Sequence, residues 1–157
     1  VVWSVECTEH LFDKPAFFRE AARWLRPGGR VAVCAWVAAE EPLSDEQRRT
    51  VERVCEGMFC PSLGTAGDYE EWLKYAGLVD VQSHDWTARV ARTWEICLDR
   101  VRRSGTGRIA PLLGRDAALF LSRFETMIEA YRTGAMRYAA VTARKDGPSS
   151  DPIENLG

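Results

Sequence analysis

The first 36 residues constrain the fold of this chain more than any other stretch, because they read as strand, helix and strand in succession. Residues 1–5 are a short apolar run rich in β-branched and aromatic side chains, which predicts a buried strand. Asp13 is a good helix N-cap, and Pro15 falls in the first turn, where its missing N–H costs nothing. Pro27-Gly28-Gly29 ends that helix, and residues 31–36 are almost all apolar, as in a strand covered on both faces of a parallel sheet. The stretch therefore predicts a βαβ unit and an α/β fold.

The loop between the first strand and the helix carries the candidate chemistry. It reads Glu6-Cys7-Thr8-Glu9-His10-Leu11-Phe12. Ligands of α/β proteins bind beyond the carboxyl ends of the strands. The two carboxylates and the imidazole of this loop are therefore expected at a ligand-binding position. Because loops are polar in general, the residues alone leave open the alternative that all three side chains are simply solvated.

The segment from Trp3 to Lys14, WSVECTEHLFDK, resembles a segment of class I S-adenosylmethionine-dependent methyltransferases. It is most similar to the W-S-x-E-[SC]-x-E-H-[ML]-x-D-K pattern that follows the fourth strand in the tocopherol C-methyltransferase group and its small-molecule (type 11) relatives. The similarity continues to about Arg144. It includes Leu25-Arg26-Pro27-Gly28-Gly29, Asp68-Tyr69, Asp85-Trp86 and Met127-Ile128-Glu129-Ala130-Tyr131.

This resemblance implies the C-terminal part of a Rossmann-like methyltransferase sheet, with parallel strands, an antiparallel last strand and an inserted helical lid. Residues 1–144 would form that portion of the domain, with lid elements at about 40–76 and 87–132, and residues 145–157 a disordered tail. The glycine-rich loop and the acidic strand end that hold the cofactor in complete enzymes are missing from the sequence. Gly105-Thr106-Gly107 follows a helical pattern and predicts an interhelical turn. We therefore expect the chain to be part of a longer methyltransferase.

By resemblance, the expected function is methyl transfer from S-adenosylmethionine to carbon, oxygen or nitrogen of a small aromatic or apolar acceptor. His10 is the expected catalytic residue, as a base or as a group that orients the acceptor. On the cofactor side we expect Glu6, Cys7 and Glu9. The carboxylates of Glu6 and Glu9 would hold the loop or complement the cationic donor, and Cys7 would form part of the wall. On the acceptor side we expect Trp36, Phe59, Trp86 and Trp94.

Two observations leave alternatives open. Some relatives pair the histidine with an aspartate at the end of the next strand, but this sequence has Cys34-Ala35-Trp36 there, which would leave orientation as the role of His10. The sequence is also compatible with a catalytically inactive fragment, or with a binding or scaffold module of methyltransferase ancestry. Exposed strand edges in such a piece favour association, so a homodimer is a possible state.

The remaining elements follow from local signals. Ser44 and Gln47 form a capping box before a helix whose apolar face would include Val51, Val54, Cys55, Met58 and Phe59. Asp68 is expected to cap the next helix, and residues 78–86 to form a strand with His84 facing outward. Residues 87–103 and 115–132 are each expected to form one helix. Residues 136–144 would form the antiparallel last strand beside the strand at Val31.

Composition and charge limit the classes of partner that the chain is expected to bind. A net charge of −2 gives no electrostatic case for binding nucleic acid, and no apolar run approaches the roughly 20 residues that span a bilayer. Five cysteines without a C-x-x-C pair predict no metal site and fit reduced thiols in the cytoplasm. The expected partner is a small-molecule acceptor.

Overall fold

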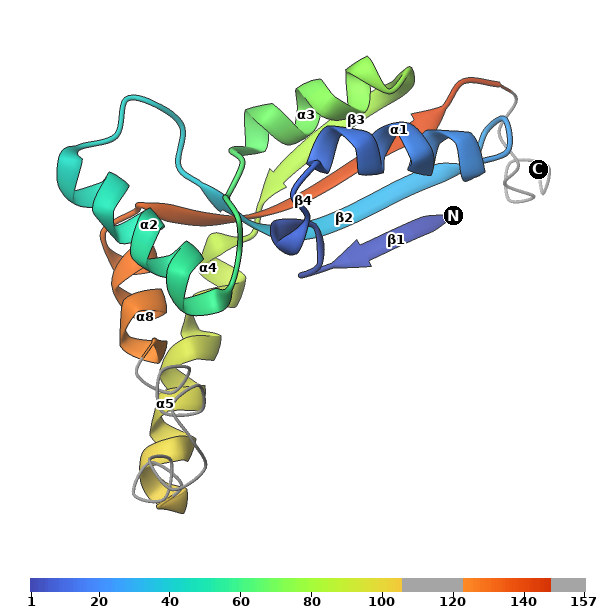
Figure 1. Cartoon of the computed structure of the whole chain (residues 1–157). Helices are drawn as coiled ribbons and strands as arrows, with labels where there is room; N and C mark the ends of the chain where they lie inside the picture. The colour runs from blue at the N-terminus through green and yellow to red at the C-terminus, as the bar shows by residue number, and fades with distance from the viewer. Residues whose placement is uncertain (106–122, 148–157) are drawn as a thin grey trace.

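A computed structural model of the chain describes residues 1–105 and 123–147, which form one mixed β-sheet with helices over one face and at one end (Figure 1). The strands are β1 (Val2–Val5), β2 (Arg30–Ala38), β3 (Leu78–Asp85) and β4 (Met136–Lys145). They lie in the order β1-β2-β4-β3. This α/β architecture agrees with the one expected from the sequence.

The predicted βαβ unit is confirmed. Strand β1 pairs in parallel with β2, with Val2 opposite Val31, and α1 (Lys14–Trp24) connects the two strands. The side chain of Asp13 caps α1 by accepting a hydrogen bond from the N–H of Ala16 at 2.7 Å. The loop after β1 therefore lies at the edge of the sheet where two parallel strands end.

The prediction that β1 is fully buried is wrong for the described chain. Trp3 is 76% exposed and Val5 is 46% exposed. Side chains alternate along a strand, and Val2 packs against the buried cluster to which α1 contributes, so Trp3 and Val5 point to the opposite face of the sheet. Strand β1 also has one unpaired edge in the described sheet (Figure 1). Trp24, the last residue of α1, is exposed as well.

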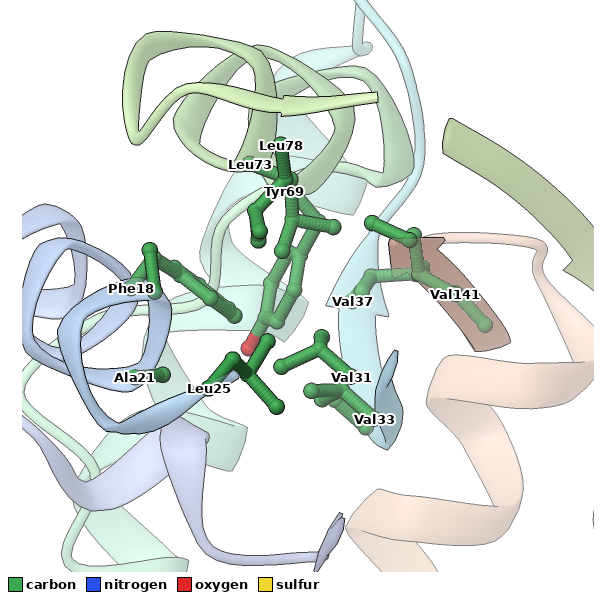
Figure 2. Close-up of a cluster of buried hydrophobic side chains, with 14 residues drawn as sticks. Phe18, Ala21, Leu25, Val31, Val33, Val37, Tyr69, Leu73, Leu78 and Val141 are labelled. Atoms are coloured by element: carbon green, nitrogen blue, oxygen red, sulfur yellow. The ribbon is translucent and has the colours of Figure 1, made fainter. Parts of the chain in front are cut away.

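The largest core lies between the sheet and the two helices α1 and α3 (Ala66–Tyr75), and we call it the inner core (Figure 2). Phe18 of α1 and Tyr69 of α3 are both fully buried, and their ring centroids lie 5.6 Å apart. The Tyr69 hydroxyl shares a hydrogen bond of 2.8 Å with the Thr8 hydroxyl. The loop after β1 is thereby tied to the inner core.

Strand β4 lies antiparallel between β2 and β3, as predicted (Figure 1). Its register with β2 runs from Arg30 opposite Arg144 to Ala38 opposite Met136. Strand β3 has an irregularity between Val79 and Gln82, beyond which His84 is exposed as expected.

The helix α2 (Asp45–Met58) begins with the predicted capping box of Ser44 and Gln47. It ends at Phe59, which has a left-handed backbone (φ 56°) and a side chain that is 63% exposed. The expectation that Phe59 belongs to the buried face of α2 is therefore wrong, because the left-handed residue turns the chain away from the helix.

Helix α3 is capped by Thr65 rather than by Asp68. The Thr65 hydroxyl accepts from the N–H of Asp68, and the Asp68 carboxylate accepts from the N–H of Thr65. Asp68 is thus the N3 residue of a capping box, where an acidic side chain is also favourable.

The single helix expected over residues 87–103 is divided into α4 (Thr87–Val90) and α5 (Arg92–Ser104). At the break, the N–H of Trp94 donates a hydrogen bond to the carbonyl of Ala91, three residues earlier, as in a 3₁₀ turn. Gly105 ends α5 with a positive φ of 72°, as expected of the first residue in the predicted turn.

Helix α8 (Phe124–Arg132) covers the second half of the helix expected over 115–132. The first part of that expected helix lies outside the described residues. The same holds for residues 106 and 107 of the predicted turn and for residues 148–157 of the expected tail. Lys145, which we placed in the tail, belongs to β4.

A second cluster of buried side chains lies at the lid end of the sheet, and we call it the lid-side cluster. Its buried members are Trp36, Val54, Met58, Cys60, Met127, Ala130, Tyr131, Met136 and Tyr138. It joins the ends of β2 and β4 to α2 and α8, which fall within the ranges expected for the lid. Helix α3 also falls within the expected range of 40–76, but it packs in the inner core instead.

Among residues 1–105 and 123–147, no helix is long and apolar enough to cross a membrane. The same part of the chain holds no group of three or more side chains suited to binding a metal ion.

Candidate functional site

The loop of residues 6–12 lies just beyond the carboxyl end of β1, beside the same end of β2 (Figure 1). The N–H of Glu6 donates to the carbonyl of Cys34 at 2.8 Å and extends the strand pairing by one step. Residues Thr8–His10 then form one turn of 3₁₀ helix. The chain thus leaves the sheet in a short, hydrogen-bonded turn at the edge where open α/β sheets bind ligands.

Two buried side chains anchor this loop. Thr8 and Glu9 are both fully buried, and Oε1 of Glu9 accepts a hydrogen bond of 2.7 Å from the N–H of Trp36 at the end of β2. Burial raises the pKa of Glu9, although hydrogen bonds from backbone N–H groups oppose that rise. Its second oxygen, Oε2, is buried and has no hydrogen-bond partner among the described residues. Glu9 therefore fastens the loop to β2 from below.

The remaining polar side chains of the loop face outward. Glu6, Cys7 and His10 are exposed, so the anchored loop presents a carboxylate, a thiol and an imidazole to solvent. The structure separates the four residues that we predicted together, since Glu9 lies beneath the loop and the other three lie on its surface.

Glu6 adopts a left-handed backbone with φ 48°, which is uncommon for a residue that is not glycine. Such conformations cost on the order of 1 kcal/mol or more and concentrate at functional sites. The Glu6 carboxylate accepts a hydrogen bond of 3.2 Å from the hydroxyl of Tyr138 on β4. Burial, followed by the Glu6 charge, raises the pKa of Tyr138, so its phenol keeps the proton that it donates.

The imidazole of His10 contacts the end of α2. Its Nδ1 lies 3.4 Å from the carbonyl oxygen of Phe59 and 3.6 Å from Sγ of Cys60. Its ring lies edge-on to Trp36, with the centroids 6.3 Å apart. The structure therefore brings His10, Trp36 and the main chain of Phe59 together.

The other predicted acceptor residues belong to the same region. The ring centroids of Trp36 and Trp94 lie 5.7 Å apart, and Trp86 packs against the lid-side cluster. The side chain of Phe59 points to solvent rather than into this cluster. The Nε1 atom of Trp36 is buried without a hydrogen-bond partner among the described residues. Three of the four aromatic residues thus share one apolar wall.

Sequence reasoning missed Tyr138 and Cys60 as parts of this site. Tyr138 is 132 positions from Glu6 along the chain, so only the sheet topology brings the two together. Only a weak indication in the sequence pointed to Cys60, which lies in the stretch that we assigned to the lid. Burial raises the pKa of the Cys60 thiol to about 12, which keeps it protonated.

A cavity of about 420 Å³ lies at the same end of the sheet, but on another side of Tyr138. Its polar lining includes Glu40, Gln47, His84, Asp85 and Arg137. The loop of residues 6–12 does not line it. The loop that carries His10 is therefore separate from this cavity.

Comparisons with known proteins point to methyltransferases. The family described as "Methyltransferase domain" matches residues 1–33. The chain is 28% identical over 151 residues to tocopherol O-methyltransferase, chloroplastic, of Arabidopsis thaliana, a match that covers 92% of this chain and 43% of that protein. It is 23% identical over 151 residues to norajmaline N-methyltransferase of Rauvolfia serpentina, covering 92% of this chain and 52% of that protein.

Among solved structures, the chain is similar to a Haemonchus contortus phosphoethanolamine N-methyltransferase 2, solved with phosphomonomethylethanolamine and S-adenosylhomocysteine. The TM-score is 0.74 at 19% identity, and the match covers 92% of this chain and 33% of that one. The chain thus spans about half, or less, of the proteins it matches. Its fold corresponds to the C-terminal part of the methyltransferase fold, and its opening segment and its relatives are similar to class I S-adenosylmethionine-dependent methyltransferases.

Proposed function

We propose that this chain supplies the acceptor side of a site for methyl transfer from S-adenosylmethionine to a small, flat, apolar molecule. The observation that carries the proposal is the gathering of Glu6, His10 and Tyr138 beside Trp36, at the carboxyl ends of β1 and β2. Polar groups that converge against an apolar wall at this edge of an α/β sheet are typical of a ligand site.

His10 acts on the acceptor in this proposal. Its imidazole is exposed, and histidine is the side chain that most often serves as a general base, so it can take the proton that a hydroxyl, amine or ring carbon loses on methylation. Orientation is its second role, because holding two reactants in line can remove on the order of 7 kcal/mol of barrier. In the described residues, Nδ1 of His10 lies next to the Phe59 carbonyl and Sγ of Cys60.

When bound, S-adenosylmethionine supplies a methyl group attached to a positively charged sulfur. The exposed carboxylate of Glu6 fits a cationic ligand, and Cys7 would form the adjoining wall of the loop. Glu9 would contribute indirectly, by holding the loop against β2 through its hydrogen bond to Trp36.

The acceptor is expected to be phenolic, prenylated or indole-like. Trp36, Trp86 and Trp94 provide an aromatic wall, and flat apolar groups pack well against aromatic rings. The names of the relatives, for tocopherol and norajmaline, fit a small-molecule acceptor. The first of these relatives is named chloroplastic, whereas our expectation for this chain remains the cytoplasm.

The test is product analysis with the intact protein. We expect that incubation with a methyl-labelled donor and a panel of phenolic, prenylated and indole compounds yields at least one product that carries the label. A parallel panel of amines and sterols distinguishes acceptor classes. Absence of any labelled product, from a protein that binds the donor in calorimetry, would contradict the proposal.

A second candidate function is a binding or scaffold module, favoured by the exposed apolar side chains of Trp3 and Val5 on β1 and of Val1 just before it. An unpaired strand edge with exposed apolar residues invites pairing with another chain, including a second copy. Sedimentation of the intact protein would show a dimer in that case, and Trp3→Lys would dissociate it. A monomer that methylates small molecules would exclude this function.

A further inference from the structure

Two atoms from the turn that ends α2 lie next to Nδ1 of His10. One is the carbonyl oxygen of Phe59 at 3.4 Å, and the other is Sγ of Cys60 at 3.6 Å. The first distance is long for an N–H···O bond, and the second is ordinary for a contact to sulfur, because sulfur is the larger atom. A single N–H can be shared between two such neighbours.

The direction of each bond follows from the chemistry of the partner. A carbonyl oxygen can only accept a hydrogen bond. The thiol of Cys60 donates its own hydrogen to the carbonyl of Met58, at 3.6 Å, so its sulfur faces His10 as an acceptor. Both neighbours of Nδ1 are therefore acceptors, and Nδ1 must carry the proton. In the neutral ring this leaves Nε2 without a proton.

The turn is built to keep these two acceptors in place. Phe59 has φ 56° and ψ 37°, so its carbonyl points away from the axis of α2 toward the loop. The N–H of Cys60 donates to the carbonyl of Cys55 at 2.9 Å, which fixes the next residue as well. Trp36 lies edge-on to the imidazole and restricts the tilt of the ring.

We infer that Phe59 and Cys60 are positioning residues that hold His10 in the Nδ1–H tautomer and leave Nε2 free as the basic nitrogen that meets the acceptor. Among the described residues, no hydrogen bond is made to Nε2. The catalytic consequence rests on the proposed function, whereas the tautomer itself is a property of the folded chain. The lid helix α2 thus determines which nitrogen of His10 is basic.

The test is nitrogen-15 NMR of the imidazole rings in the full chain, at a pH about two units above the ordinary histidine pKa of about 6.5. The chain has two histidines, and the exposed His84 serves as an internal reference. In water a free imidazole side chain favours the Nε2–H tautomer, so we expect that form for His84 and the Nδ1–H form for His10. An Nε2–H signal from His10 would overturn the inference.

A matched pair of variants at Phe59 tests the role of the turn. Phe59→Gly keeps the positive φ without strain and should keep the Nδ1–H form. Phe59→Val disfavours the positive φ and should shift His10 toward Nε2–H. Equal spectra for both variants, with backbone amide spectra that show a folded chain, would overturn the inference. If Phe59→Val does not fold, the unmodified chain and Phe59→Gly still decide the question.

The two proposals fail separately. An Nδ1–H tautomer in a protein that methylates nothing would leave the inference standing and remove the proposed function. Methylation by a protein whose His10 is Nε2–H would do the reverse.

Discussion

The inner core and the lid-side cluster are both buried, but they differ in composition. The inner core is mainly aliphatic, and the hydroxyl of its one buried tyrosine is paired with Thr8. The lid-side cluster holds all three methionines of the chain, Met58, Met127 and Met136, together with Trp36 and its unpartnered Nε1. Methionine adapts its shape to what it contacts, and an unpartnered polar atom is available to a ligand. We infer that the inner core mainly stabilises the fold and that the lid-side cluster mainly forms the wall of the candidate acceptor site.

The largest expected effect breaks the inner core. Phe18→Ala removes a fully buried ring between α1 and the sheet, and should lower the free energy of unfolding by about 3–5 kcal/mol. Urea unfolding followed by circular dichroism measures it. Phe12→Ala is the matched control, because Phe12 is 93% exposed and its loss should change stability by no more than about 0.5 kcal/mol. Equal losses in both variants would contradict the assigned core.

The next effect belongs to the site and should leave stability alone. We predict that His10→Ala lowers turnover of the intact protein at least about tenfold, which is about 1.4 kcal/mol of activation free energy. His84→Ala is the control, since His84 is exposed on β3 and away from the loop. Steady-state kinetics with a product-forming acceptor measures both variants. Unchanged turnover in His10→Ala would make His10 a structural residue.

Substitutions of Tyr69 and Tyr138 compare the stability of the inner core with that of the candidate site. Tyr69→Phe leaves the buried Thr8 hydroxyl without its partner and should cost about 1–2 kcal/mol of unfolding free energy. Tyr138→Phe frees a Glu6 carboxylate that solvent can hydrate, so its stability should be nearly unchanged while acceptor binding weakens. Urea unfolding of both variants decides the matter, and a larger loss in Tyr138→Phe would reverse the assignment of roles.

The smallest expected effect is a pH slope from Glu9. Its pKa is raised in the folded chain, mainly by burial, so its contribution to stability is full below the ordinary pKa of 4.5 and is lost as pH rises through the folded value. Glu9→Gln keeps an oxygen for the Trp36 N–H and cannot ionise. Relative to the unmodified chain, this variant should therefore gain stability as pH rises above about 4.5. Parallel urea curves at all pH values would show that Glu9 is not buried as described.

Much of the fold was predictable because its signals are local. The Asp13 cap, the Ser44–Gln47 capping box and the apolar run of β2 each act within a few residues of the chain. The errors arose where a local signal had two solutions, as at Asp68, which occupies the third position of a capping box instead of the cap itself. The break at Ala91 gave no such signal, because alanine favours helix.

The chain's own residues determined that it forms a strand–helix–strand unit with a polar loop at the sheet edge, since strand pairing and helix caps depend on nearby sequence. Only the tertiary structure decided what that loop contacts. It buried Glu9 against the end of β2, brought Tyr138 of β4 to Glu6, and placed the end of α2 against His10. Those contacts join residues 27 to 132 positions apart, and no local propensity encodes which distant backbone group a side chain will meet.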